Sequence, residues 1–212
     1  MSNRLSIESI VATGRGDDGT TGLLYSSDRV PKDDPRAEAY GTVDEAVAVL
    51  GMARAELALK EQYGVLAGGL IDLPEIILRL QRELFVVGAE LATPADQRAK
   101  LSDGATKVTV GMIEGLEAIL VAVERRIGMP REFVVPGETR VSAALELART
   151  VTRRAERRVV TLARTGRLDD SLVVPYLNRL ADLLWVLARA DEQGEAHRAT
   201  PARPRPDDGA AT

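Results

Sequence analysis

Five long segments of the chain space their apolar residues as one face of an α-helix does. In the second segment, for example, Ile77, Leu80, Leu84 and Val87 fall on one face. The expected helices cover residues 37–62, 74–91, 107–127, 140–164 and 169–190. Long helices joined by short connections predict an all-α fold, specifically an antiparallel five-helix bundle.

The composition agrees with a helical fold, and the length fits one large domain or two small ones. Aromatic residues make up only 3% of the 212 residues, whereas strands favour aromatic and β-branched side chains. We expect residues 11–192 to form the bundle domain and residues 1–10 to be a flexible N-terminus. Residues 193–212, rich in Pro, Ala and Asp, are expected to be a disordered tail.

Several kinds of chemistry are excluded by what the sequence lacks. There is no cysteine, and the single histidine, His197, lies in the polar tail. Thiol nucleophiles, disulfides and thiolate metal sites are therefore excluded, and neither a Ser-His-Asp triad nor a multi-histidine metal site is expected. The net charge of −4 argues against a nucleic-acid partner. Without a membrane-length apolar run or a signal peptide, the sequence predicts a soluble cytoplasmic protein.

Residues 149–158, RTVTRRAERR, concentrate five arginines and one glutamate in the fourth expected helix. At about 100° per residue, four of them lie within roughly a quarter turn: Arg149, Arg153, Glu156 and Arg157. The opposite, apolar side is expected to hold Leu147, Val151, Ala155 and Leu162. A positive face of this kind suits an anion with several oxygens, such as a polyphosphate. The alternative is a solvated surface or an oligomer interface held by salt bridges.

A glycine-rich loop near the N-terminus is a second candidate for binding phosphate. Its residues are Thr13, Gly14, Gly16, Gly19, Thr20, Thr21 and Gly22. Backbone N–H groups and hydroxyls in such a loop can cradle phosphates, although the loop matches no established nucleotide fingerprint. The alternative is a flexible loop. Lys32 could neutralise a phosphate in the same region or be an ordinary solvated lysine.

Three further residues have two interpretations each. Asp44 is either a partly exposed helical carboxylate or a buried or interfacial partner for an arginine. Phe133, before a VVPG turn, is a core anchor when considered alone. Asn178 in the fifth helix is either exposed or placed for a specific hydrogen bond, and periodicity does not decide which.

Taken together, six blocks resemble the PduO-type ATP:cob(I)alamin adenosyltransferases over residues 11–192. The blocks are TGRGDDGTTGL, RVPKDDPRAEAYGTVDE, LQRELFVVGAELATP, FVVPG, ARTVTRRAERRVV and YLNRLADLLWVLAR. The resemblance implies a homotrimeric five-helix bundle that binds ATP between the N-terminal loop of one subunit and the helices of its neighbour. It also implies that the Co(I) of reduced cobalamin attacks the 5′ carbon of ATP and that triphosphate leaves with Mg²⁺. A corrinoid reductase and an adenosylcobalamin-dependent mutase are the protein partners that it suggests.

The resemblance also gives roles to individual residues. Residues 13–16, including Arg15, residues 20–22 and Lys32 would hold the triphosphate. The nucleotide would further contact Arg153, Arg154, Glu156, Arg157 and Asn178. Asp44 would pair with Arg149 across the subunit interface. Phe133 would press under the corrin ring and keep the lower axial ligand away, which makes reduction to Co(I) easier.

The chain departs from the family pattern at a few positions. Gly14 and Arg15 stand where the family usually has Lys or Arg followed by Thr, and Glu138 replaces a usual glycine. The altered loop supports a second hypothesis, a non-catalytic protein that binds ATP and cobalamin as an escort or sensor. A third hypothesis is a bundle whose arginines serve only assembly.

Overall fold

A computed structural model describes residues 10–59, 65–66, 71–168 and 170–203 of the chain. The helices within these residues are α1 (Pro35–Ala58), α2 (Leu73–Ala92), the 3₁₀ helix η1 (Ala95–Lys100), α3 (Val110–Glu124), α4 (Arg140–Ala163) and α5 (Val173–Gly194). The strands are β1 (Thr20–Gly22), β2 (Arg29–Pro31), β3 (Val65–Leu66), β4 (Ile71–Asp72), β5 (Val134–Val135) and β6 (Thr200–Pro201). They form three antiparallel pairs, β1 with β2, β3 with β4 and β5 with β6.

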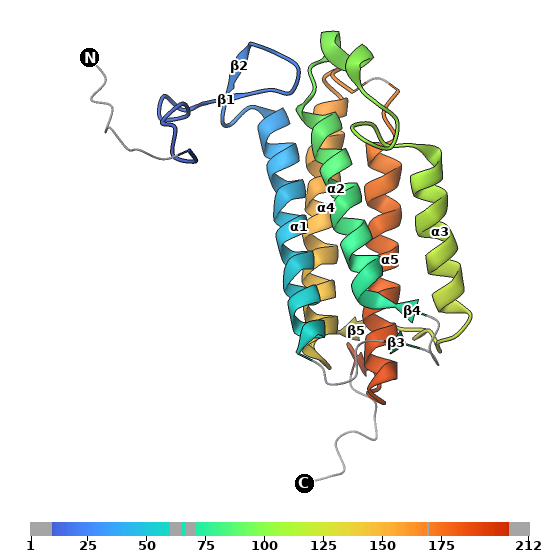
Figure 1. The fold of residues 1–212 in the computed structure, drawn as a ribbon. Coiled ribbons are helices and arrows are strands. Elements are labelled where there is room, and N and C mark those ends of the chain that lie inside the picture. The colour runs from blue at the N-terminus through green and yellow to red at the C-terminus, as the bar shows by residue number, and fades with distance from the viewer. Residues whose placement is uncertain (1–9, 60–64, 67–70, 169, 204–212) are drawn as a thin grey trace.

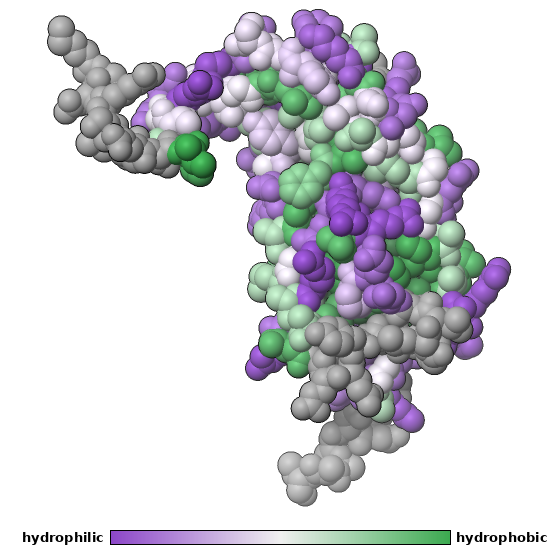
Figure 2. All heavy atoms as spheres, in the orientation of Figure 1, coloured by the Kyte–Doolittle hydropathy of each residue, from purple (hydrophilic) through white to green (hydrophobic). Residues whose placement is uncertain are grey.

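The α-helices lie side by side, and successive helices run in opposite directions (Figure 1). This arrangement confirms the expected helical bundle. The β1–β2 hairpin projects from one end of the bundle, whereas the β5 turn lies at the other end (Figure 1). On the face drawn in Figure 2, polar and apolar side chains are interspersed. In the part of the chain that the structure describes, no helix is long and apolar enough to cross a membrane.

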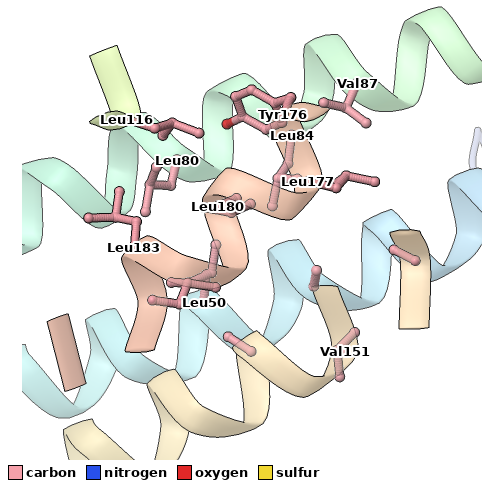
Figure 3. Close-up of a cluster of buried hydrophobic side chains, with 14 of the residues drawn as sticks. Leu50, Leu80, Leu84, Val87, Leu116, Val151, Tyr176, Leu177, Leu180 and Leu183 are labelled. Carbon is pink, nitrogen blue, oxygen red and sulfur yellow. The ribbon is translucent and has the colours of Figure 1, made fainter. Parts of the chain in front are cut away.

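Helix α5 is the centre of the hydrophobic core. Its side chains Leu177, Leu180 and Leu183 are fully buried and lie among leucines of the surrounding helices, including Leu50 and Leu80 (Figure 3). The apolar positions expected to share one face of α2, Ile77, Leu80, Leu84 and Val87, are buried. A helix that is buried around much of its circumference needs apolar residues on more than one face. The long apolar run in the fifth expected helix therefore belongs to the middle of the bundle.

Local signals fix where most helices begin. The Asp34 carboxylate accepts a hydrogen bond from the Arg36 amide at 2.8 Å, so α1 begins at Pro35 and not at residue 37. Helix α4 begins at Arg140, as expected, because Thr139 and Ser142 form a reciprocal capping box. The fifth helix begins at Val173, later than residue 169, since Asp170 has a φ of 56° and cannot continue a right-handed helix.

Three further expectations are corrected. Leu147 is 47% exposed and does not belong to the buried side of α4, although Val151, Ala155 and Leu162 do. The polar loop after α2 contains the unexpected helix η1. Disorder from residue 193 is wrong as far as residue 203, because α5 continues to Gly194 and β6 pairs with β5. Residues 1–9, 60–62, 169 and 204–212, which several expectations include, lie outside the described residues.

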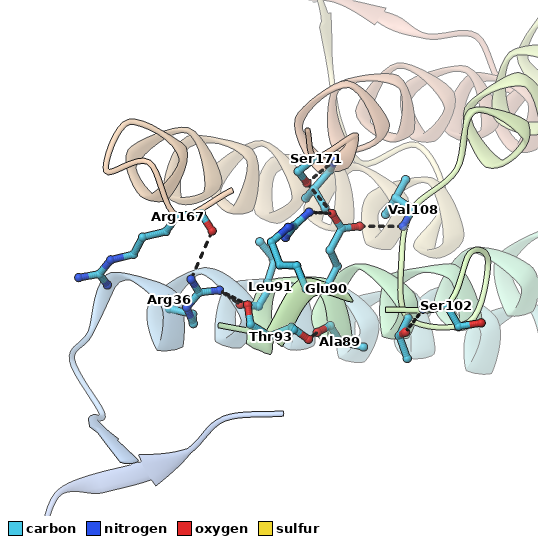
Figure 4. Close-up of polar contacts among 12 residues, drawn as sticks. Arg36, Ala89, Glu90, Leu91, Thr93, Ser102, Val108, Arg167 and Ser171 are labelled. Atoms are coloured by element: carbon cyan, nitrogen blue, oxygen red, sulfur yellow. Dashed lines mark hydrogen bonds and ion pairs between the residues drawn. The ribbon is translucent and has the colours of Figure 1, made fainter. Parts of the chain in front are cut away.

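A buried polar network joins the start of α1 to the end of α2, next to the N-terminal hairpin. Arg36 donates to the carbonyl oxygens of Leu91 and Thr93 at 2.6 and 2.8 Å (Figure 4). Burial lowers the pKa of the Arg36 guanidinium. Nearby, the fully buried carboxylate of Glu90 accepts hydrogen bonds from Arg98 and from the Val108 amide. These contacts fix the end of α2, where the hairpin is held by a hydrogen bond of 2.9 Å from the Leu24 amide to the Ala92 carbonyl oxygen.

Candidate active site

Hollows along one side of α4 are lined by four residues that we call the arginine face: Arg149, Arg153, Glu156 and Arg157. A hollow of about 350 Å³ has Arg153, Glu156 and Arg157 in its wall. The next, of about 390 Å³, is lined by Arg149 and Arg153 together with Trp185 of α5. Because the two hollows share Arg153, they follow one another along the helix. The sequence therefore gathers these side chains as predicted, on a face with room for an extended anion.

Asn178 joins this face from α5. Its amide nitrogen donates to the Glu156 carboxylate at 3.2 Å. The side chain is exposed, so the question that periodicity left open is answered by a specific hydrogen bond on an accessible surface. The pair leaves the face with a carboxylate and an amide among its arginines, two groups able to accept hydrogen bonds from a ligand.

A third and larger hollow, of about 710 Å³, continues from Arg149 to the β5 turn. Arg149 and Trp185 line both this hollow and the middle one, and Phe133 and Val134 form part of its apolar wall. Phe133 is 90% exposed, so its interpretation as a core anchor is wrong. The volume lies in the range that accommodates a sizeable organic ligand.

The segment after α5 contributes to this large hollow. The Ala202 amide donates to the Phe133 carbonyl oxygen at 2.7 Å, and Ala202 and Arg203 line the hollow. The Thr200 hydroxyl donates to Glu138, the residue that departs from the family pattern. The carboxylate of Glu138 therefore holds the β6 segment beside the turn.

Beneath Arg149 lies a cluster of buried charges. Arg149 Nε donates to Glu146 Oε2 at 2.6 Å, and Glu146 is only 4% exposed. Arg189, 1% exposed, lies 3.2 Å from Glu146 Oε1 and 2.8 Å from Glu192 Oε1. Burial raises the pKa of the Glu192 carboxyl, and the positive charge of Arg189 opposes that rise.

The glycine-rich loop forms a turn that leads into strand β1 of the β1–β2 hairpin. Gly14 and Gly19 have φ values of 65° and 79°, which favour glycine. Lys32 lies over the loop, since a Cβ added at Gly16 would be 3.1 Å from its Nζ. Arg15, Thr13 and Thr21 complete the loop, in which Arg15 is exposed. The expected phosphate-binding residues thus come together around one turn.

Arg29 stabilises this turn through side-chain hydrogen bonds. Its Nε donates to Thr20 Oγ1 at 2.7 Å, and its Nη2 donates to the Arg15 carbonyl oxygen at 2.7 Å. The Thr20 hydroxyl in turn donates to Asp18 and, with the Thr20 amide, lowers the pKa of that carboxyl. The Thr20 side chain is therefore occupied within the loop, and Gly22 lies opposite Arg29 in the hairpin register.

Two expected site residues lie away from the α4 face. Arg154 points toward α1, where its guanidinium pairs with Glu45, because 100° of rotation separates it from Arg153. Asp44 is exposed on α1, and its carboxylate has no hydrogen bond or ion pair with any described residue. Within the described chain, Arg149 pairs with Glu146 and not with Asp44.

The hairpin and the arginine face are not joined within one chain. Among the described residues, no hydrogen bond or ion pair connects residues 13–22 with Arg149, Arg153 or Arg157. The hairpin projects at one end of the bundle (Figure 1), where the Leu24 amide donates to the Ala92 carbonyl oxygen of α2 at 2.9 Å.

Sequence reasoning missed three important residues. Glu146 could have been found, since it precedes Arg149 by three positions on a helix, the spacing of a side-chain pair. Arg189 also gave a signal as a cation inside the apolar run LLWVLARA. Arg29 gave none, because its role depends on the hairpin register.

Comparison with known proteins decides the family. A family model described as cobalamin adenosyltransferase matches residues 11–191. The chain belongs to the cobalamin adenosyltransferase family. It is 37% identical to a corrinoid adenosyltransferase of Citrobacter freundii over 182 residues, which cover 86% of this chain and 94% of that protein. A corrinoid adenosyltransferase of Bacillus subtilis is 36% identical over 84% of this chain and 83% of its own length.

Solved structures agree with this family. A variant of the PduO-type ATP:corrinoid adenosyltransferase from Lactobacillus reuteri, complexed with cobalamin and ATP, matches with a TM-score of 0.76 and 28% identity. The match covers 92% of this chain and 99% of that one. Another variant from the same organism, complexed with ATP, matches with a TM-score of 0.74 and 29% identity over 90% of this chain and 99% of that one. The chain is thus an enzyme with ATP:corrinoid adenosyltransferase activity.

Proposed function

We propose that the chain transfers the 5′-deoxyadenosyl group of ATP to cob(I)alamin, with the triphosphate on the arginine face and the corrin in the large hollow beside Phe133. The observation that carries this assignment is the wall shared by the hollows at Arg149 and Trp185. A polyphosphate and a large ring could lie end to end on this surface. The adenosyl 5′ carbon would then lie where the two regions meet.

The chemistry requires charge and positioning from the protein. The cobalt lone pair attacks the 5′ carbon, a Co–C bond forms, the C–O bond breaks, and its electron pair leaves on triphosphate. No proton is transferred, so the chain needs no general base. Arg153 and Arg157 would hold the charge that develops on the leaving group, where water exclusion strengthens their effect. Glu156 and Asn178 would contact the nucleotide between them.

Phe133 is suited to contact one face of the corrin. Its aromatic ring is almost fully exposed on the β5 turn, whose backbone is held by β6. Exposing a side chain of this size has a free-energy cost of about 2 kcal/mol, which a ligand that covers the ring would remove. Pressed against the corrin, it would exclude the lower axial ligand and favour Co(I).

Mg²⁺ is assigned to the triphosphate and not to a site built by the protein. The described residues contain no group of three or more Asp, Glu or His that could hold a metal ion. Magnesium in nucleotide sites is bound largely by phosphate oxygens and water, so the arginine face and the loop are compatible with it. A corrinoid reductase would supply the reduced cobalamin, and an adenosylcobalamin-dependent mutase would receive the product.

A homotrimer would complete the site. The loop of residues 13–22 with Lys32 would cover the triphosphate bound to a neighbour's α4. Asp44 would pair with Arg149 of an adjacent subunit. Two features support this arrangement: the separation of hairpin and arginine face within one chain, and the unpaired carboxylate of Asp44 among the described residues.

Mixing two inactive variants tests the shared site. Lys32→Ala would impair the loop and Arg153→Ala the face. In trimers assembled from equal amounts of both, about a quarter of the sites would combine an intact loop with an intact face. Adenosylation measured after co-refolding should therefore recover to about a quarter of the wild-type rate. No recovery above the separate variants would place both regions of one site in a single chain.

Single-turnover kinetics test the activity itself. The chain, mixed with ATP and chemically reduced cobalamin, should give the absorbance change of Co–C bond formation and one triphosphate for each adenosylcobalamin. Nucleotide binding without this absorbance change would instead support the escort or sensor hypothesis. A chain that binds no ATP would support a purely structural role for the arginines.

A further inference from the structure

The charged cluster beneath the site forms a continuous chain of alternating sign. From the core outward it runs through Glu192, Arg189, Glu146 and Arg149, with nitrogen–oxygen distances of 2.8, 3.2 and 2.6 Å. The first three side chains are almost completely buried, whereas the Arg149 side chain is 26% exposed and lines two hollows. The cluster therefore connects the interior of α5 to the surface of α4.

We infer that Glu146 is a positioning residue that orients the Arg149 guanidinium at the junction of the two hollows. This inference rests on the proposed role of Arg149. A long arginine side chain on a surface samples many rotamers, and its restriction has an entropic cost. The short hydrogen bond to Nε restricts the plane of the guanidinium before any ligand binds. It leaves both terminal nitrogens without a hydrogen bond to described residues, so they remain available to a second carboxylate or an anion.

Arg189 has a supporting part in this arrangement. The buried carboxylate of Glu146 would strongly destabilise the fold if it had no cationic partner in the interior. The guanidinium of Arg189 offsets this cost of burying a charge. Arg189 is itself held by Glu192 and by the ring of Trp185, whose centroid lies 5.9 Å from the Arg189 Cζ. Trp185 lines the same two hollows as Arg149. The cluster thus orients Arg149 and stabilises the adjacent aromatic wall together.

A kinetic double-mutant cycle separates positioning from a merely structural role. The proteins are the wild type, Glu146→Gln, Arg149→Ala and the double variant, with kcat and the KM for ATP measured for each. Glu146→Gln should lower kcat about ten- to a hundredfold, the effect of a misplaced contact group. In the Arg149→Ala background the same change should alter kcat less than about twofold, because Glu146 then has nothing to position.

Glu83→Gln is a matched control. Glu83 also binds an arginine Nε on its own helix, that of Arg79 at 2.7 Å, but it lies on α2 away from the hollows. This variant should change thermal stability and leave kcat unchanged. If Glu146→Gln does not fold, Glu146→Asp keeps the charge, retracts the carboxylate, and should give the same cycle.

The outcomes distinguish the inference from the proposed function. The positioning role of Glu146 would be overturned if Glu146→Gln lowered kcat equally in the wild-type and Arg149→Ala backgrounds. It would also be overturned if Glu146→Gln had the wild-type kcat. Neither result would contradict the proposed role of Arg149. Wild-type kcat in Arg149→Ala would instead refute the role of Arg149 on which the inference rests.

Discussion

Replacing Arg153 with alanine should lower kcat/KM for ATP by about 10²–10³-fold, the loss expected when one preorganised charge contact to a leaving group is removed. Arg153 lines both hollows that the triphosphate would occupy, and its backbone carbonyl accepts a hydrogen bond from Arg157. Most of the loss should appear in kcat, since negative charge on the leaving oxygen develops during the reaction. Steady-state rates over a range of ATP concentrations would measure both constants.

Arg158→Ala provides the control for this prediction. Arg158 lies on the same helix but pairs with Glu38 of α1 at 3.1 Å, away from the hollows. An exposed ion pair of this kind contributes at most about 1 kcal/mol to stability, so its removal should leave both rate and assembly nearly unchanged. Similar activity losses for the two variants would show that total positive charge, and not the arginine face, governs the reaction.

Replacing Phe133 with alanine should also have a large effect, in this case on the reaction of cobalamin. We expect about a ten- to hundredfold fall in kcat with cobalamin, from loss of the contact that displaces the lower axial ligand. The KM for ATP should change little, because Phe133 lines only the large hollow. Absorbance of bound Co(II) cobalamin would show directly whether the lower ligand is still displaced in the variant.

Stability gives an independent check on this prediction. Since Phe133 is 90% exposed, its truncation creates no cavity, and the free energy of unfolding should stay within about 0.5 kcal/mol of the wild type. Phe133→Leu, which keeps an apolar group of smaller area, should retain intermediate activity. A marked loss of stability, or a loss of ATP affinity equal to that of cobalamin, would contradict the role assigned to the ring.

Much of the fold follows from the sequence because helical periodicity reports directly on burial. The inward positions of α2 could be identified in this way, and the start of α4 at Arg140 was also expected. What could not be identified depended on backbone conformation or distant partners. The left-handed φ of Asp170 delays α5, and the pairing of β6 with β5 orders part of an otherwise polar tail. Neither interaction has a periodic signature.

The candidate site also contains some residues that the sequence could identify and others that it could not. Arg149, Arg153 and Arg157 could be grouped because a single helix carries them, and the structure brings them to one surface. Asn178 needed the packing of α5 against α4 before its partner, Glu156, could be known. Arg154, which the resemblance places at the nucleotide, pairs with Glu45 on another side of α4, since adjacent residues on a helix point in different directions. The loop residues came together through Arg29, a contact that sequence spacing does not reveal.

The uninterrupted course of α4 would set a fixed distance between the regions proposed to bind the two substrates. With a rise of 1.5 Å per residue, about 12 Å separates the levels of Arg149 and Arg157. That length is rigid, because backbone hydrogen bonds and packing against α1 and α5 both fix it. Changes in the hairpin or in the β5 turn, which lie at opposite ends of the bundle, would leave this spacing unchanged. One inserted residue would turn half of the arginine row by about 100° away from the other half.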